Sequence, residues 1–140
     1  MDKFFNRVKQ AEILNFPKIL DPRGNLTFMQ YPSQIPFKIK RVFWLYDVPG
    51  GGLRGGHAYR LQNEVIIALS GSFDVVITRA DGTKEKYALN RSYYGLYVPA
   101  RTWRHIENFS TNAVGLHLSS HSYDSADYIR DFETFIAKRT

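Results

Sequence analysis

The stretch GGLRGGHAYRLQNEVIIALSG, residues 51–71, sets His57, Tyr59 and Glu64 behind a glycine-rich loop and closes on another glycine. Side chains two positions apart on a strand point to the same face, so His57 and Tyr59 should face a common space. The glycines before them let the backbone come close to a bound molecule. This stretch therefore predicts a β-structure whose polar side chains gather at one ligand site.

The spacing resembles the first of two motifs of the cupin family, with Tyr59 in place of that motif's second histidine. PARTWRHIEN, residues 99–108, resembles the second motif, but Arg104 stands where a metal-binding cupin has its last histidine ligand. A divalent ion needs three or four converging ligands, and a guanidinium can only donate hydrogen bonds. His105 cannot take over, because neighbouring strand residues face opposite sides. We expect no metal, no cofactor and a site that attracts anions.

Composition and length limit the class of protein. The chain has 140 residues, enough for one domain (1–140) with its own core. It has no cysteine, no apolar run approaching the roughly 20 residues of a membrane span and no signal-peptide core, so we expect a cytoplasmic protein without a membrane partner. The net charge of +6 comes from scattered Lys and Arg, with no basic stripe for nucleic acid. A phosphorylated small molecule is the favoured partner.

Short strands separated by turns fill most of the chain from residue 41 onward. We expect strands at 41–46, 64–69, 73–78, 84–89, 94–98, 103–109 and 113–119, with Asp81-Gly82 as a hairpin turn. With the two motifs they predict a mainly β fold, a cupin-type jelly-roll barrel whose mouth is the ligand site. In the last strand Val114, Leu116 and Leu118 should face the core, which leaves His117 pointing outward.

The two ends of the chain follow other patterns. Aromatic and aliphatic residues recur at helical spacing near the C-terminus, which predicts a helix at about 125–138, capped by Asp124 or Ser125 and packed on the barrel. Tyr128 belongs to that apolar stripe, so we assign it to core packing. The N-terminal extension, about residues 1–16, is compatible with a short helix or with an edge strand.

His57 and Tyr59 are the candidate catalytic residues. An imidazole titrates at about 6.5 and can take and return a proton near neutrality. A phenol titrates at about 10, so it donates to a developing oxyanion more readily than it acts as a base. Nearby cations, Arg54, Arg60 or Arg104, could lower the pKa of Tyr59 by favouring the phenolate.

Six further residues are candidates for substrate binding. An arginine can hold phosphate oxygens through two parallel hydrogen bonds. A glutamate at a ligand position of a site without a metal can pair with an arginine or bind sugar hydroxyls. The six are Arg23, Arg54, Arg60, Asn63, Glu64 and Arg104. Arg23 lies in a predicted turn, and Arg54 lies in the glycine loop.

Seven short segments resemble the sugar 3,4-ketoisomerases, the WxcM-like family of FdtA and QdtA type. They are FPKI (16–19), DPRGNL (21–26), IPFKIKRV (35–42), RGGHA (54–58), GSF (71–73), YGLYV (94–98) and DYIR (127–130). The resemblance spans about residues 16–135 and implies a metal-free cupin acting on dTDP-4-keto-6-deoxyglucose. It implies proton transfer between C3 and C4 through an enediol, which supplies a 3-keto sugar for amino-deoxysugars of surface glycans such as lipopolysaccharide. It also implies a homodimer with exchanged N-terminal strands.

The chain departs from this family at one catalytic position. The family has His-Ala-His, so His57 corresponds to the first histidine and Tyr59 replaces the second. Three outcomes stay open: His57 shuttles the proton alone, Tyr59 acts as acid or base, or activity is lost or redirected. A His and Tyr pair serves the related cupin 3,5-epimerases, which favours retained activity.

Two other functions are compatible with the same residues. One is a nucleotide-sugar 3- or 5-epimerase, and the other is a non-catalytic nucleotide-sugar-binding cupin. The residues do not assign the C4 configuration of the product, and thymidine recognition enters only through the resemblance.

Overall fold

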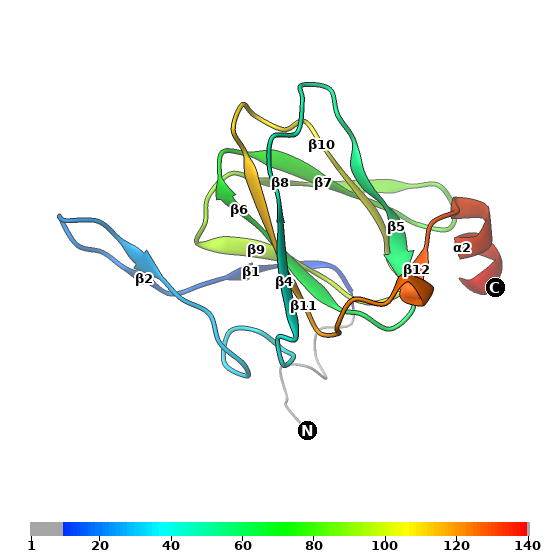
Figure 1. Ribbon diagram of the computed structural model, residues 1–140, viewed down its shortest axis with the longest axis horizontal. Helices are drawn as coiled ribbons and strands as arrows, with labels where there is room; N and C mark the ends of the chain where they lie inside the picture. Colours follow the sequence, from blue (N-terminus) through cyan, green and yellow to red (C-terminus); the bar gives the residue numbers. More distant parts are fainter. Residues whose placement is uncertain (1–9, 140) are drawn as a thin grey trace.

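A computed structural model describes residues 10–139. Two antiparallel five-stranded sheets face each other and form a barrel (Figure 1). The first sheet has, in order, β1 (Glu12–Asn15), β9 (Tyr94–Val98), β6 (Glu64–Ser70), β11 (Val114–Ser119) and β4 (Arg41–Leu45). The second has β12 (Tyr128–Ile129), β5 (Arg54–Tyr59), β10 (Trp103–Glu107), β7 (Phe73–Thr78) and β8 (Lys84–Leu89). The predicted jelly-roll fold is confirmed.

The space between the sheets is filled by apolar side chains that alternate along the strands. Buried examples from both sheets are Ile66, Phe73, Val75, Leu96 and Ile106. The β7–β8 hairpin has the predicted bounds, and Gly82 at its turn takes a φ of +88°, a conformation that glycine adopts without strain. The alternation along each strand therefore determines which side chains face the interior of the barrel.

A second apolar layer covers the outer face of the first sheet. Leu14, Phe16, Ile35 and Phe37 from the N-terminal part pack there against residues that include Ile67 and Leu118. β1 pairs with β9 as an edge strand, which settles residues 12–15 of the N-terminal extension, while residues 1–9 lie outside the described part.

His117 corrects one sequence prediction. Its side chain is 1% exposed and points into the barrel, whereas Leu116 and Leu118 pack in the outer apolar layer. Alternation shows which residues of a strand share a face, but both faces of β11 are buried here. The aliphatic side therefore marks the outer layer, and the polar side faces the barrel interior.

The C-terminal helix is shorter than predicted. A 3-10 turn, η1 (Ser125–Asp127), leads into β12, and α2 spans Phe132–Arg139. The predicted cap Asp124 accepts a hydrogen bond from the Ala126 amide within η1, while Asp131 accepts from the Thr134 amide at the start of α2. Tyr128 pairs with Tyr59 across β12 and β5, so its assignment to a helical core stripe was wrong.

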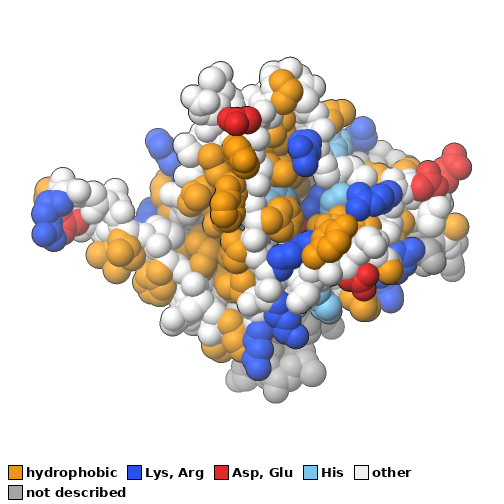
Figure 2. Space-filling view, in the orientation of Figure 1, with side chains coloured by type: hydrophobic (Ala, Val, Ile, Leu, Met, Phe, Trp, Pro, Cys, Tyr) orange, Lys and Arg blue, Asp and Glu red, His pale blue; other side chains and the backbone are white. Residues whose placement is uncertain are grey.

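A two-stranded arm projects away from the barrel (Figure 1). It consists of β2 (Lys18–Ile19) and β3 (Leu26–Thr27), and it carries exposed apolar residues including Leu20 and Phe28 (Figure 2). Within residues 10–139, no helix is long and apolar enough to cross a membrane.

Candidate active site

A pocket of about 370 Å³ opens into the barrel between the sheets. Strands β4, β5, β10, β11 and β12 all contribute to its wall. The lining residues are Phe43, Leu45, Arg54, Gly55, Gly56, His57, Tyr59, Arg104, Ile106, His117, Tyr128 and Arg130. The segment 51–59 and the segment 99–108 therefore meet at one site, as their motifs predicted, and a third segment, 128–130, joins them.

His57 lies on β5 opposite Arg104 of β10 and is 8% exposed. Burial, followed by the charge of Arg104, lowers the pKa of His57 to about 3, so the imidazole is neutral at pH 7. Its Nδ1 atom is buried and has no hydrogen-bond partner among residues 10–139. From the sequence, His57 was expected to have the ordinary imidazole pKa of about 6.5. In the structure its pKa is lower, so the base is already deprotonated at pH 7 before substrate binds.

Arg104 and Glu64 form a buried ion pair at the base of the pocket. The Arg104 Nε atom donates to Glu64 Oε1 at 2.8 Å, Nη2 approaches the same oxygen at 2.6 Å, and Nη1 donates to the Gly55 carbonyl at 2.6 Å. Burial opposes ionisation of Glu64, but Arg104 and His117 outweigh it and lower the Glu64 pKa to about 2. Glu64 is therefore ionised at pH 7, and Arg104 holds its carboxylate in place.

Gly55 makes this arrangement feasible. It takes a φ of +70°, and a Cβ atom at this position would lie 2.4 Å from Arg104 Nη1. His117 completes the cluster by donating from Nδ1 to Glu64 Oε2 at 3.3 Å, and its ring stacks on Phe43 at 4.4 Å. The predicted orientation of strand β10 is confirmed, because His105 faces away and contacts Glu107 at 2.7 Å.

Two phenols stand beside His57. The rings of His57, Tyr59 and Tyr128 meet edge to face with centroid separations of 4.7 to 4.9 Å. The Tyr59 hydroxyl donates to the Tyr128 oxygen at 3.4 Å. Burial, followed by the charge of Glu64, raises the pKa of Tyr59 above its usual range. Arg104 acts in the expected direction and lowers this pKa, but burial and Glu64 outweigh it. Tyr59 is a protonated phenol in this pocket.

Several pocket residues escaped sequence reasoning. Tyr128 of β12 and Arg130, which follows that strand, both line the pocket, and the Arg130 guanidinium lies 4.3 Å from the centre of the Tyr128 ring. Arg41 donates to the Tyr128 hydroxyl at 3.5 Å and to the side chain of Gln62 at 3.0 Å. The only available signal was the DYIR segment, whose tyrosine and arginine alternate as pocket-facing strand residues do.

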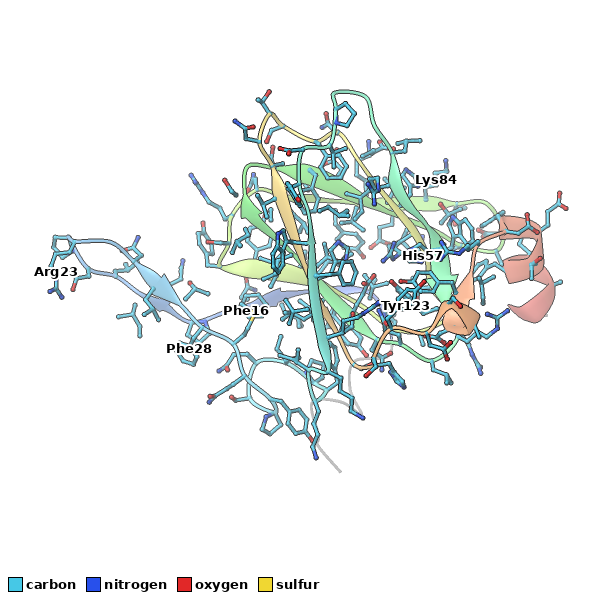
Figure 3. The ribbon with its side chains drawn as sticks, viewed as in Figure 1. Phe16, Arg23, Phe28, His57, Lys84 and Tyr123 are labelled. Atoms are coloured by element: carbon cyan, nitrogen blue, oxygen red, sulfur yellow. The ribbon has the colours of Figure 1, made fainter. Side chains whose placement is uncertain are left out.

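The remaining predicted binding residues divide into two groups. Arg54 lines the pocket, whereas Arg60 donates to the Ala126 and Tyr128 carbonyls, and the Asn63 side chain accepts from the Ala100 amide. Arg60 and Asn63 thus hold backbone segments together outside the pocket. Arg23 lies at the tip of the arm, paired with Asp21 and far from His57 (Figure 3).

The fold and the pocket define a cupin with acid–base side chains inside its barrel. The family model described as WxcM-like, C-terminal (FdtA) matches residues 9–140. The TDP-4-oxo-6-deoxy-alpha-D-glucose-3,4-oxoisomerase of Aneurinibacillus thermoaerophilus is 36% identical over 126 residues, 90% of each chain. The chain therefore belongs to the WxcM-like family of sugar 3,4-ketoisomerases, as the sequence segments predicted.

Solved structures agree with this membership. The TDP-quinovose 3,4-ketoisomerase from Campylobacter jejuni is 38% identical, with a TM-score of 0.86 over 93% of this chain and 99% of that one. A 3,4-ketoisomerase from Thermoanaerobacterium thermosaccharolyticum, solved with TDP, is 32% identical, with a TM-score of 0.89 over 94% and 95%. An epimerase from Mycobacterium tuberculosis is 18% identical with a TM-score of 0.72, which shows a shared fold alone.

Proposed function

We propose that this protein is a dTDP-4-keto-6-deoxy-D-glucose 3,4-ketoisomerase. The observation that carries the proposal is a neutral imidazole, His57, next to a protonated phenol, Tyr59, in one pocket of a ketoisomerase-family barrel. Isomerisation needs a base for the C3 hydrogen and a donor for the oxygen where charge develops. The product would serve the synthesis of amino-deoxysugars for surface glycans, in the cytoplasm.

His57 is the proposed base. A neutral imidazole can remove the C3 hydrogen, which the adjacent 4-ketone acidifies, and the resulting imidazolium can return it at C4. Tyr59 donates towards the oxygens of the enediol. The dTDP diphosphate carries negative charge, and its approach to the pocket would stabilise the imidazolium that forms in the first step.

Cationic side chains support binding of the nucleotide diphosphate. Arg54 and Arg130 both line the pocket, and Figure 2 shows Lys and Arg side chains near histidine on this side of the molecule. Glu64 holds Arg104 in place, so we assign Arg104 the role of forming the pocket floor and giving that floor a positive charge. Glu64 acts in the same way, as the partner of Arg104 and His117. No metal or cofactor enters the proposed reaction.

An exchange experiment tests this function. Incubation with dTDP-4-keto-6-deoxyglucose in D2O, followed by proton NMR, should give a 3-keto product whose C4 carries deuterium whenever the proton on His57 equilibrates with solvent. Exchange at C5, or exchange at C3 with an inverted 4-keto product, would instead support an epimerase. Binding of the nucleotide sugar without exchange or product would support a non-catalytic protein and would refute the isomerase.

We further propose a homodimer in which the β2–β3 arms are exchanged between the two copies. The arm leaves its own barrel and exposes apolar area, with Leu20 72% and Leu26 53% accessible. Such area on an extended arm favours burial against a second copy. Exchange would also carry Arg23 away from its own barrel towards the partner.

Sedimentation equilibrium tests the dimer. The substitution Leu20→Asp should shift the protein towards monomer, because a buried unpaired carboxylate opposes docking of the arm. Leu61→Asp is the matched control, since Leu61 is 62% exposed on another part of the surface and should leave the dimer intact. A parent protein that sediments as a monomer at micromolar concentration would contradict the exchange.

A further inference from the structure

The proposed reaction moves two hydrogens, and His57 accounts for only one of them. The C3 hydrogen goes to C4, and the hydroxyl hydrogen of O3 must reach O4 as the ketone moves from C4 to C3. The two oxygens sit on adjacent carbons, so this second transfer needs a donor at O4 and an acceptor at O3 that exchange a proton with each other. Protein groups that face both oxygens can form such a relay.

Tyr59 and Tyr128 have the geometry of such a relay. Their hydroxyl oxygens are 3.4 Å apart, and both residues line the pocket beside His57. Hydrogen bonds used in catalysis are often long in an empty site and shorten when substrate binds. A pair of phenol oxygens at this separation can face two neighbouring sugar oxygens at the same time.

We propose that Tyr128 is a second catalytic phenol, which together with Tyr59 carries the hydroxyl hydrogen from O3 to O4. This inference rests on the proposed 3,4-ketoisomerase function and deepens it. It also gives the tyrosine at position 59 a role in the reaction. One imidazole could serve both oxygens in turn, whereas Tyr59 acts with a second phenol that its own hydroxyl already contacts.

The first half-reaction forms the enediol. His57 takes the C3 hydrogen as a proton, the C3–H electron pair becomes the C3–C4 double bond, and the carbonyl electron pair takes a proton at O4 from the Tyr128 hydroxyl. The Tyr59 hydroxyl, which already donates to the Tyr128 oxygen, passes its proton to that oxygen.

The second half-reaction forms the 3-ketone. The oxygen of Tyr59 takes the proton of O3, the O3–H electron pair becomes the C3 carbonyl bond, and the double-bond pair takes the proton of the His57 imidazolium at C4. All three residues end in their starting state, and no oxidant or reductant is consumed.

Arg41 supports the assignment of Tyr128 as the donor to O4. Its Nη2 atom lies 3.5 Å from the Tyr128 oxygen, and a cation there reduces the cost of negative charge on this oxygen as its proton leaves. Tyr59 also has a cation nearby, because the Arg104 guanidinium lies 5.4 Å from the centre of its ring, but burial raises the pKa of Tyr59 and disfavours its phenolate. The phenolate that the first half-reaction leaves on Tyr59 lies beside the imidazolium of His57, whose ring centre is 4.8 Å away, until the proton of O3 restores the phenol.

The substitution Tyr128→Phe tests the relay. It removes one oxygen and keeps the ring, so dTDP binding by calorimetry and KM should stay near the parent values while kcat falls about 100-fold. The solvent isotope effect on kcat should increase, because hydroxyl-proton transfer becomes the slow step. The control Tyr123→Phe changes a tyrosine that is 62% exposed and should keep the parent kcat. A Tyr128→Phe enzyme with the parent kcat would overturn the proposal.

Variants that also change Tyr59 distinguish a proton relay from a structural role of Tyr128. The Tyr59→Phe, Tyr128→Phe double variant should be no slower than the slower single variant, because the two phenols act as a unit. Tyr59→His should be active, and adding Tyr128→Phe to it should then cost little, because one imidazole replaces both phenols. An inactive Tyr59→His enzyme, or an equal loss from Tyr128→Phe in both backgrounds, would overturn the relay and leave the isomerase function standing. A parent protein without isomerisation would refute the function itself.

Discussion

The substitution His57→Asn should abolish hydrogen exchange at C3 while dTDP still binds. Asparagine keeps a polar side chain of similar reach but cannot accept and return a proton near neutrality. Loss of a general base costs about 100- to 10,000-fold in rate, and His57 is the imidazole that stands beside both phenols of the pocket. Single-turnover NMR exchange measures the loss, and calorimetry with dTDP measures the binding that should survive.

His105→Asn is the matched control for this substitution. His105 is a histidine on β10 that faces away from the pocket towards Glu107, so its loss should leave the exchange rate unchanged. An exchange rate in His57→Asn close to the parent rate would refute the assignment of the base. Equal losses in both variants would point to general destabilisation and would equally contradict it.

The pH profile of the parent enzyme follows from the same assignment. His57 must be neutral to act as a base, and burial lowers its pKa to about 3 in the free protein. Protonation therefore removes the base only as the pH falls towards this value, and kcat/KM, which reports the free enzyme, should not decline through pH 6.5. The bound diphosphate should raise the pKa, so kcat should decline at a higher pH than kcat/KM.

Strands were predictable where local alternation and turn residues agree. The bounds of β7, β8 and β9 coincide with the predicted 73–78, 84–89 and 94–98. Asp81 accepts from the Thr83 amide, and Gly82 adopts the left-handed conformation, so this hairpin is specified by its own residues. The same local rules placed His57 and Tyr59 on one face of β5 before the fold was known.

Errors arose where a distant segment decides the structure. The apolar residues from 128 to 136 have helical spacing, yet Tyr128 and Ile129 pair with β5 and form a strand. That pairing requires a free edge of β5, which is distant in the sequence. The local pattern of residues 128–136 therefore cannot indicate it. Likewise, the burial of His117 follows from the N-terminal layer that covers the opposite face of β11. Tyr128 and His117, the two residues that were predicted wrongly, both line the pocket.

The interaction of Arg104 with an anion was predictable in kind. The sequence indicated that a guanidinium at a ligand position attracts an anion, and it left open whether Glu64 pairs with an arginine or binds sugar hydroxyls. The structure supplies the anion from the protein itself, because Glu64 binds Arg104 from the position where it would otherwise act as a ligand. In the proposed function the charge of the substrate is left to Arg54 and Arg130, which line the pocket.

The buried pair of Arg104 and Glu64 leads to the largest expected effect on stability. Their side chains are 1% and 0% exposed, so the substitution Arg104→Met leaves Glu64 as a buried carboxylate with His117 as its remaining partner. Removing one member of a buried pair costs about 3–5 kcal/mol in free energy of unfolding. Urea unfolding at pH 7 measures this loss.

Arg79→Met provides the comparison, because Arg79 and Glu85 form an ion pair with side chains that are 51% and 41% exposed. An exposed pair contributes about 0–1 kcal/mol, so this control should unfold at nearly the parent urea concentration. Replacing both buried partners, Arg104→Met with Glu64→Leu, should recover most of the loss, because no unpaired charge remains in the interior. In the single variant the loss should shrink as the pH falls, since Glu64 without Arg104 regains a higher pKa and can become neutral. If Arg104→Met costs no more than Arg79→Met, or if the loss does not depend on pH, the pair does not hold the pocket floor in the way its contacts indicate.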